Sequence, residues 1–487
     1  MLRKIRITLA IIFFCATTLL FLDVTGLLHL YLGWLAKVQL LPAILALNVG
    51  VVAAILLVTL LFGRVYCSVI CPLGVMQDCF SWLGGRVKKN RFHYTKASNV
   101  LRYGVLVVFV VLMVVGLGAL ASIIAPYSAF GRIVTTLFQP LYIWLNNLLA
   151  SISAHFDSYA FYGVETYAKG ALAITVSALL FVIVGFLSFR YGRLWCNTVC
   201  PVGSLLGLVS RFSLFRPVFD VEKCNACTRC ARNCKCSCID PDRHEIDASR
   251  CVACMDCIVN CKQGAIRFAL RKKAVKSSEL AVDSSRRKFL ATTALVSASA
   301  AIASKAQAVD GGLAVIEEKK VPRRKTPLKP FGSQGQKHFA THCTSCQLCV
   351  SECPSHVLRP SKSITSLLQP EMSYEKGYCR PDCTRCSQVC PSGAIRPISP
   401  NEKTSISIGF AVTVLENCVA YRDGVNCGTC ARHCPAGAIR MVEKGSVRIP
   451  SVDENRCLGC GACEYYCPSR PFSAIYVEGR TQPIMNR

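Results

Sequence analysis

The chain has few acidic side chains for its size and lacks the motifs of two large classes of protein. Aspartate and glutamate number 28 against 56 lysines and arginines, so the formal charge of the 487 residues is +28. This balance is common in nucleic-acid-binding proteins, but no nucleic-acid motif is present, and the basic residues gather beside apolar stretches as in membrane proteins. The chain also lacks a C-x-x-C-H haem motif and a helix with a histidine pair for haem b. We therefore expect no nucleic-acid partner and no haem.

Apolar residues and cysteine are abundant instead. Hydrophobic residues make up 52% of the sequence, concentrated in residues 1–210, and there are 32 cysteines. Most cysteines fall in tight C-x-x-C-x-x-C-x-x-x-C runs, which bring thiolates to a metal centre, whereas disulfide frameworks spread cysteines to close long loops. The sequence predicts an α-helical membrane domain, with four helices plus a signal or anchor helix, followed by α+β ferredoxin-like [4Fe–4S] domains.

The membrane domain is predicted over residues 1–210. Crossing a bilayer takes about 20 apolar residues, and four stretches fit: 7–22, 38–62, 103–125 and 171–189. The apolar stretch 138–149 is interrupted by Pro140, so we expect an interfacial helix there.

The orientation of these helices follows from their flanking charges. The N-terminus carries Arg3, Lys4 and Arg6, and the segment between the second and third stretches is rich in lysine and arginine. Arg132 and Lys169 are the only arginine and lysine residues of the segment 126–170. The positive-inside rule therefore places the N-terminus and the residues after 189 in the cytoplasm.

A twelve-residue repeat follows two of the predicted helices. Residues 63–74 read GRVYCSVICPLG and residues 192–203 read GRLWCNTVCPVG. Two spans separate the copies, so both lie on one side in parallel repeats. Their four cysteines are expected to ligate a metal or cluster or to act as redox thiols; alternatively, C-x-x-x-C-P only shapes the start of a helix. These cysteines are Cys67, Cys71, Cys196 and Cys200.

Residues 211–275 have the cysteine spacing of a bacterial two-cluster ferredoxin. In this arrangement three neighbouring thiolates and the fourth cysteine of the other run hold each [4Fe–4S] cluster. Zinc is the alternative, although zinc sites usually use two separated C-x-x-C pairs. Lys235 and Lys262 replace the proline that usually follows the fourth cysteine, and Cys236 and Cys238 have no assigned role. The predicted ligand sets are Cys224, Cys227, Cys230 and Cys261, and Cys251, Cys254, Cys257 and Cys234.

Four more cysteine modules lie in residues 338–487, which raises the predicted number of clusters to as many as six. Each module ends in Cys-Pro, followed by a small turn and an apolar strand, as in the ferredoxin unit. Which fourth cysteine serves which cluster stays open, because module one can pair with module two or with module four. In chain order the modules are Cys343, Cys346, Cys349 and Cys353; Cys379, Cys383, Cys386 and Cys390; Cys418, Cys427, Cys430 and Cys434; and Cys457, Cys460, Cys463 and Cys467.

Residues 284–308 read as an export signal in the middle of the chain. They contain paired arginines at 286 and 287, a weakly apolar run and Ala306-Gln307-Ala308 in the order of a twin-arginine signal. The signal is expected to be cleaved after Ala308 or kept as a fifth span, and the alternative is an ordinary helical linker. Residues 309–337, rich in lysine, arginine, proline and glycine, are expected to be a flexible tether.

The two halves resemble two known families. Residues 1 to about 270 resemble NapH-type membrane ferredoxins, with their two Cys-x3-Cys-Pro motifs, and residues 284–487 resemble periplasmic four-cluster ferredoxins of the NapG and MauM type. The chain looks like a fusion of the two. The resemblance implies a quinol dehydrogenase of the bacterial inner membrane, multi-pass, with the N-terminus in the cytoplasm and the C-terminal domain in the periplasm.

This reading predicts an electron path from a membrane quinol through the outer clusters to a periplasmic acceptor, either a c-type cytochrome or a reductase. No catalytic residue and no quinone pocket is identified from the sequence. Two other functions stay open. Related membrane ferredoxins serve the maturation or maintenance of copper enzymes, and a redox sensor without turnover would use the same clusters.

Overall fold

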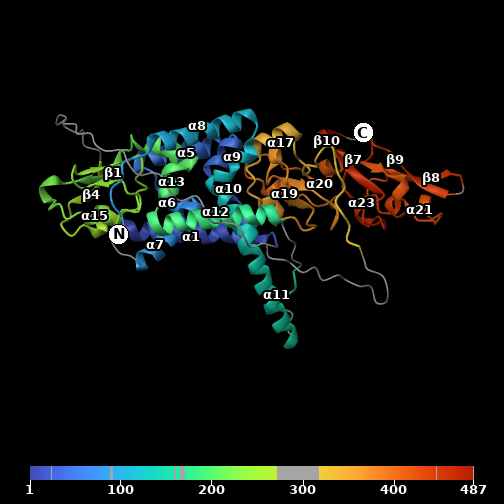
Figure 1. The fold of residues 1–487 in the computed structure, drawn as a ribbon, viewed down its shortest axis with the longest axis horizontal. Helices are drawn as coiled ribbons and strands as arrows, with labels where there is room; N and C mark the ends of the chain where they lie inside the picture. Colours follow the sequence, from blue (N-terminus) through green and yellow to red (C-terminus); the bar gives the residue numbers. More distant parts are fainter. Residues whose placement is uncertain are drawn as a thin grey trace, which may run out of the picture.

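The computed structural model describes residues 1–23, 25–87, 92–157, 161–164, 170–270, 317–445 and 447–485. These residues form three parts along one long axis (Figure 1). A first cysteine-rich domain (residues 211–270) lies at one end beside the N-terminus, a helical part (residues 1–210) lies in the middle, and a second cysteine-rich domain (residues 317–485) lies at the other end. The predicted export signal and the tether up to residue 316 fall outside the described residues.

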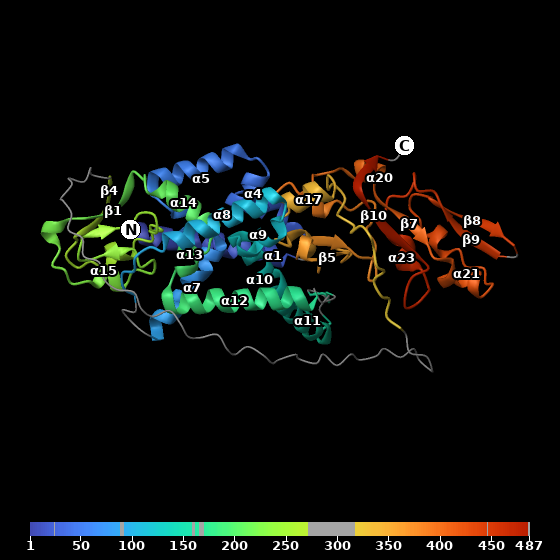
Figure 2. The same cartoon turned by 45° about the horizontal axis from the view of Figure 1, so that its top comes forward.

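Apolar helices occupy all four predicted positions, but they differ in length. Among the described residues, α1 (Leu2–Leu22) and α12 (Ala171–Tyr191) are long and apolar enough to cross a membrane. α5 (Val49–Phe62) and α8 (Asn99–Val115) are shorter. All four run along the long axis of the molecule (Figures 1 and 2). Four full-length spans are therefore not confirmed.

The second and third stretches are shorter because the chain breaks within each. Asn48 caps α5 by accepting a hydrogen bond from the backbone N–H of Val51 at 3.3 Å, which separates α5 from α4 (Leu40–Leu45). Gly116 ends α8 with a left-handed φ of 90°, and α9 (Gly118–Ile124) follows it. Two short helices, α2 (Leu27–Leu32) and α3 (Trp34–Lys37), follow α1.

The chain bends by 79° after α9. The bent segment contains α10 (Pro126–Ile133), the π-helix Val134–Phe138 and α11 (Gln139–His155), and with α9 it would count as a third span. Figure 1 shows α11 projecting from the body, across the direction of α12. Its exposed side chains include Leu141, Trp144 and Leu148. An apolar helix with an exposed tryptophan that lies across the spans fits the predicted interfacial position.

Both copies of the twelve-residue repeat form a short helix, a turn and a longer helix. The first copy builds α6 (Val65–Val69) and the start of α7 (Pro72–Val87), and the second builds α13 (Leu194–Thr198) and the start of α14 (Pro201–Ser210). Proline at the first position of α7 and α14 suits a helix start, because proline has no N–H to leave unpaired there.

Each cysteine-rich domain consists of short helices and two-stranded antiparallel sheets. In the first domain the strand pairs are β1 (Phe215–Phe219) with β4 (Ile266–Leu270) and β2 (Ile239–Asp240) with β3 (Glu245–Ile246), and the helices are α15 (Arg229–Arg232) and α16 (Asp256–Asn260). In the second domain the pairs are β5 (Leu358–Pro360) with β6 (Pro370–Met372), β7 (Ile406–Thr413) with β10 (Ile475–Met485), and β8 (Ile439–Lys444) with β9 (Val447–Val452). Its helices are α17 (Gln336–His342), α18 (Leu348–Ser351), α19 (Arg385–Val389), α20 (Pro400–Ser405), α21 (Val419–Arg422), α22 (Thr429–Arg432) and α23 (Ala462–Tyr466).

A charged network on Asp78 joins the helical part to the first cysteine-rich domain. Asp78 in α7 accepts from Arg6 at 3.2 Å, from Arg193 at 2.8 Å and from Lys235 at 2.9 Å. Burial alone would raise the pKa of Asp78, but Arg193 and Lys235 lower it well below its usual range. One carboxylate thus connects the N-terminal helix, the second repeat and the first domain.

Replacing Asp78 with asparagine should therefore destabilise the chain. Two nearly buried cations would lose their carboxylate, and breaking a buried ion pair from one side removes about 3 kcal/mol. Thermal unfolding followed by circular dichroism in detergent measures the loss. Arg380→Gln is the matched control, because Arg380 and Asp382 form an exposed pair with 57% and 68% of their side chains accessible. Equal midpoints for the two variants would contradict this role for Asp78.

Candidate functional site

The cysteine loops share a backbone conformation that suits an anionic cluster. In four of the six modules the residues directly before and after the second of the four cysteines have positive φ, between 49° and 80°. Non-glycine residues rarely adopt such values, and their alternation with ordinary residues forms the concave N–H arrangement that surrounds iron–sulfur clusters. The residues are Ala226 and Thr228, Ala253 and Met255, Ser345 and Gln347, and Gly459 and Gly461.

Backbone N–H groups point at several of the predicted ligand sulfurs. Three fourth cysteines accept a backbone N–H on sulfur, as cluster ligands do. These hydrogen bonds are Ile395 N–H to Cys390 Sγ at 3.4 Å, Ala438 N–H to Cys434 Sγ at 3.3 Å and Ala474 N–H to Cys467 Sγ at 3.3 Å.

The neighbours of the thiols favour one pairing of the modules in the second domain. Burial raises the pKa of the Cys349 thiol, and the neighbouring thiols of Cys346, Cys343 and Cys390, followed by Cys386, raise it further. This order favours grouping the first module with Cys390, the fourth cysteine of the second. Burial raises the pKa of Cys430 to about 11, with Cys467, Cys418 and Cys427 as its neighbours. The four groups are Cys343, Cys346, Cys349 and Cys390; Cys379, Cys383, Cys386 and Cys353; Cys418, Cys427, Cys430 and Cys467; and Cys457, Cys460, Cys463 and Cys434.

In the first domain the predicted sets have an additional neighbour. Cys230 lies near Cys224 and Cys227, and Cys257 lies near Cys251 and Cys234 and, less closely, near Cys230. The Sγ atom of Cys238 lies 3.6 Å from that of Cys234, however, and Cys238 is 1% exposed. The sequence signal for this arrangement is the run Cys-Lys-Cys-Ser-Cys at 234–238. That run alone did not predict a role for Cys238.

The structure also explains why lysine replaces proline at position 235. Lys235 bonds Asp78 at 2.9 Å and Asp256 at 3.4 Å, and its carbonyl accepts the backbone N–H of Arg193 at 2.7 Å. Lys235 therefore docks this domain onto the helical part, which a proline ring cannot do.

The first module of the second domain rests directly on the helical part. Arg132, fully buried, donates to the carbonyls of Ser122 at 3.2 Å and Ile123 at 2.9 Å, and to that of Ser345 at 3.4 Å. Ser345 lies between Cys343 and Cys346. Arg132, near the end of α10, thus holds a cysteine loop of the second domain against α9 and α10.

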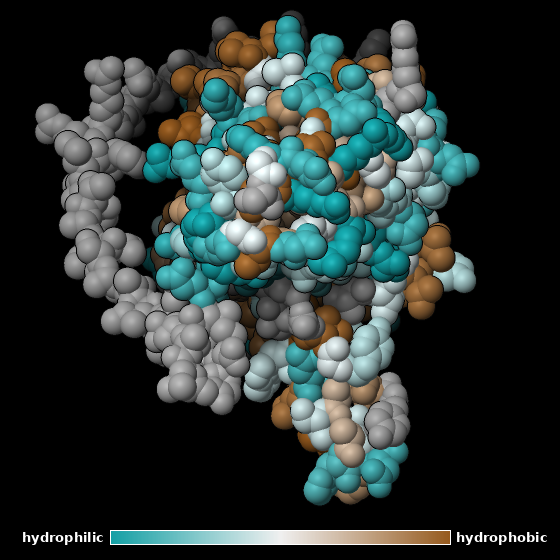
Figure 3. Space-filling view, turned by 90° about the vertical axis from the view of Figure 1, so that its right-hand side faces the viewer, coloured by the Kyte–Doolittle hydropathy of each residue, from teal (hydrophilic) through white to brown (hydrophobic). Residues whose placement is uncertain are grey.

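The remaining modules lead away from the helical part. The backbone N–H of Cys379 in module two donates to the carbonyl of Cys460 in module four at 2.9 Å. Module four exchanges its fourth cysteine with module three, and α21 and β8 of module three lie at the far end of the molecule (Figure 1). The spatial order is therefore one, two, four, three. The end face of this domain is mostly hydrophilic (Figure 3).

The four repeat cysteines are neighbours at the other end of the helical part. Cys67, Cys71, Cys196 and Cys200 are each at most 3% exposed. Gln77 in α7, three residues after the first repeat, donates its amide N–H to Cys196 Sγ of the second repeat at 3.1 Å.

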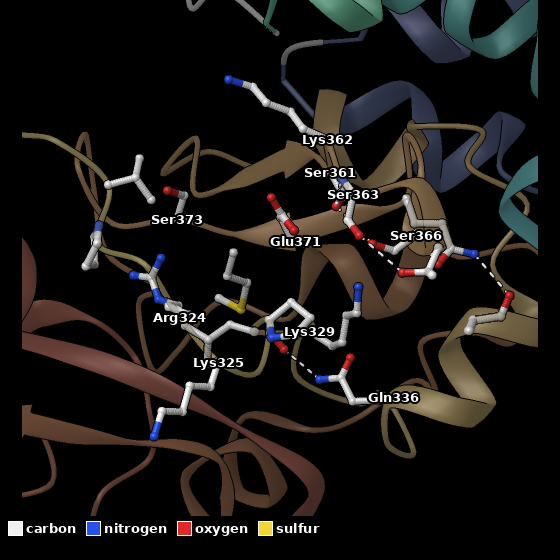
Figure 4. Close-up of a pocket in the computed structure, with 18 of the residues that line it drawn as sticks. Arg324, Lys325, Lys329, Gln336, Ser361, Lys362, Ser363, Ser366, Glu371 and Ser373 are labelled. Atoms are coloured by element: carbon white, nitrogen blue, oxygen red, sulfur yellow. Dashed lines mark hydrogen bonds between the residues drawn. The ribbon is translucent and has the colours of Figure 1, made fainter.

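A cavity of about 630 Å³ opens beside the first module, between the helical part and the second domain. Gly116 and Leu117 form part of its helical side. Figure 4 shows Glu371 between the basic side chains that line the cavity. Lys329 is 5% exposed, and its ammonium has no hydrogen-bond partner in the described part of the chain. The basic residues of the lining are Arg324, Lys325, Lys329 and Lys362.

Ferredoxin-like modules with these cysteine loops define an iron–sulfur electron-transfer protein of the ferredoxin type. Two family models agree: one described as a 4Fe-4S binding domain matches residues 44–91 and 172–220, and one described as a 4Fe-4S dicluster domain matches residues 342–394 and 425–470. No solved structure matches the chain.

Individual relatives give the chain a more specific classification. The methylamine utilization ferredoxin-type protein MauM of Methylobacillus flagellatus is 32% identical over 170 residues, covering 32% of this chain and 70% of that protein. The chain therefore belongs to the MauM family of ferredoxin-type proteins. The ferredoxin-type protein NapF of Escherichia coli is 28% identical, over 31% of this chain and 85% of its own length. The ferredoxin-type protein NapH of Haemophilus influenzae is 28% identical over 38% of this chain, which spans 52% of that relative.

A buried lysine beside module two should set the potential of the cluster there. Lys403 is 2% exposed and donates to Cys379 Sγ at 3.2 Å. Hydrogen bonds to cluster sulfurs raise the reduction potential, so Lys403→Met should lower one midpoint potential by on the order of tens of millivolts.

Redox titration followed by electron paramagnetic resonance measures this shift. Lys444→Met is the control, because Lys444 is exposed at the edge of β8 and faces the Tyr421 ring. An unchanged set of potentials in Lys403→Met would show that this hydrogen bond has no effect on the cluster.

Proposed function

We propose that the chain is a fusion of a membrane ferredoxin and a periplasmic four-cluster ferredoxin, and that it acts as a quinol dehydrogenase. It takes electrons from a membrane quinol and delivers them to a periplasmic acceptor, a c-type cytochrome or a reductase. When bound, the [4Fe–4S] clusters accept and pass single electrons. The N-terminus and the first domain would lie in the cytoplasm and the second domain in the periplasm, exported in folded form by the signal at 284–308.

The observation that carries the proposal is the linear order of the cysteine groups. The first module contacts the helical part through Arg132, and the third lies farthest from it. Electrons that enter at module one would therefore leave at module three, on a hydrophilic face open to a soluble partner (Figure 3).

The cavity beside module one is the place we propose for the quinol headgroup. Val114 and Val115 at the end of α8 are 81% and 66% exposed, so a molecule dissolved in the bilayer reaches Leu117 along an apolar surface. Burial lowers the pKa of Lys329, while the nearby Cys343 and Glu371 oppose that shift. Its ammonium lies over the Phe339 ring, 5.1 Å from the ring centroid, and has no hydrogen-bond partner in the described part of the chain, so it could donate to a quinol oxygen.

Oxidation of the quinol to the quinone releases two electrons and two protons. The electrons would pass singly to the first cysteine group. Among the described residues that line the cavity, Glu371 is the one carboxylate, and it would accept a proton and pass it to solvent.

Glu371→Gln should slow quinol oxidation by about 10–100-fold, because the amide cannot accept the proton. Bleaching of the iron–sulfur absorbance after addition of a menaquinol analogue, under anaerobic conditions, measures the rate. Reduction by dithionite should be unchanged, and Glu416→Gln, outside the cavity, should behave as the unmodified chain. Normal quinol-driven bleaching in Glu371→Gln would place the quinol elsewhere, whereas no bleaching in the unmodified chain would reject quinol as donor.

Removal of a module-four ligand should separate electron entry from electron exit. Cys457→Ser interrupts the path between modules two and three, so quinol should still bleach part of the absorbance while reduction of cytochrome c falls to the background rate. Stopped-flow absorbance on the full chain measures both. Cytochrome c reduction at the normal rate would show that electrons leave before module four.

A further inference from the structure

The two repeats bind each other reciprocally around their cysteines. Arg64 of the first repeat donates to the carbonyl of Cys196 in the second at 3.3 Å. Arg193 of the second repeat donates to the carbonyl of Cys67 in the first at 2.6 Å. Both arginines are fully buried. The pseudo-symmetric exchange of donors fixes the two cysteine pairs against one another.

The last glycine of each repeat is required for this approach. A Cβ on Gly74 would lie 2.3 Å from the carbonyl oxygen of Cys67 and 3.0 Å from the Arg193 guanidinium. A Cβ on Gly203 would lie 2.2 Å from the carbonyl oxygen of Cys196 and 2.9 Å from the Arg64 guanidinium. Two equal constraints at matching positions indicate one composite site.

The surroundings of the four sulfurs favour an anionic centre. Gln77 donates to Cys196 Sγ at 3.1 Å, and the backbone N–H of Gly203, at the start of α14, donates to Cys200 Sγ at 3.3 Å. Arg64 and Arg193 add two buried positive charges beside the thiols. A [4Fe–4S] cube with four thiolates carries a net negative charge, which these donors and cations offset.

We infer that Cys67, Cys71, Cys196 and Cys200 together hold one further [4Fe–4S] cluster, with two ligands from each repeat. The matching family model for 4Fe-4S binding covers residues 44–91 and 172–220, and the cysteines from 224 onward lie outside both segments. The segment 172–220 contains two cysteines, too few for a cube. The structure supplies the other two from the first repeat.

This cluster would connect the first domain to the membrane. Asn197, next to Cys196, donates to the carbonyl of Cys236 at 3.3 Å, and Arg64 donates to the carbonyl of Ser249, next to the ligand run at 251, at 3.0 Å. The inference stands whether or not quinol is the electron donor, because it concerns what the thiols bind.

The test uses the full chain purified anaerobically. The double variant Cys67→Ser with Cys196→Ser should lose about four iron and four acid-labile sulfide per chain, together with one redox-active component in the magnetic resonance titration. Cys15→Ser with Cys79→Ser, which removes two exposed cysteines of α1 and α7, is the matched control and should lose neither.

Three outcomes would overturn the inference. Iron content equal to that of the control, with disulfides among these cysteines in the unmodified chain by mass spectrometry, would make them redox thiols. Loss of zinc instead of iron would make the site a zinc site. If the double variant does not fold, Gln77→Leu replaces it, because this change removes one hydrogen-bond donor to Cys196 Sγ. One midpoint potential should then fall while the iron content stays constant. An unchanged set of potentials would contradict the inferred cluster.

Discussion

The helical part depends on two buried arginines that each repeat offers to the other. A fully buried guanidinium needs acceptors for its N–H groups, because an unpaired buried charge is strongly unfavourable. Arg64 and Arg193 find them on the cysteine carbonyls of the opposite repeat. This exchange of hydrogen bonds between the repeats positions the four thiols and the starts of α7 and α14. It also positions the surface on which the first cysteine-rich domain docks. Asp78 completes it by accepting from Arg193, Lys235 and Arg6 at once.

The same electrostatic logic recurs at the other end of the molecule. Thiolate-bound clusters are anionic and sit in buried loops, so nearby cations and N–H groups stabilise them. Lys403 donates to a ligand sulfur, Lys319 donates to the carbonyl of Cys467, and Arg132 holds the loop of module one. Part of the chain's excess of positive charge is therefore interior and faces cysteine loops, in addition to the basic residues that flank the apolar helices.

The cysteine groups follow one another along the long axis of the molecule. The first domain and the four repeat cysteines lie at one end of the helices. Module one lies at the other end, in contact with α9 and α10. Beyond it the groups follow in the order one, two, four, three, which differs from the order in the chain. Antiparallel pairing of β7 with β10 produces this difference, because it brings module four back beside module two.

Local sequence determined the parts of this protein, since cluster loops, apolar helices and helix starts are specified by spacing over fewer than about 25 residues. The modules, the helix starts of the repeat, and the strands β5, β8 and β10 after three of the four Cys-Pro pairs of the second domain could be read from it. After the remaining pair, Cys390-Pro391, the predicted strand is not formed, and Ile395 makes only an isolated bridge with Ser333. Tertiary structure decided what depends on residues far apart. The docking role of Lys235, the meeting of the four repeat cysteines and the grouping of Cys390 with module one rest on contacts between distant segments, which no local pattern encodes.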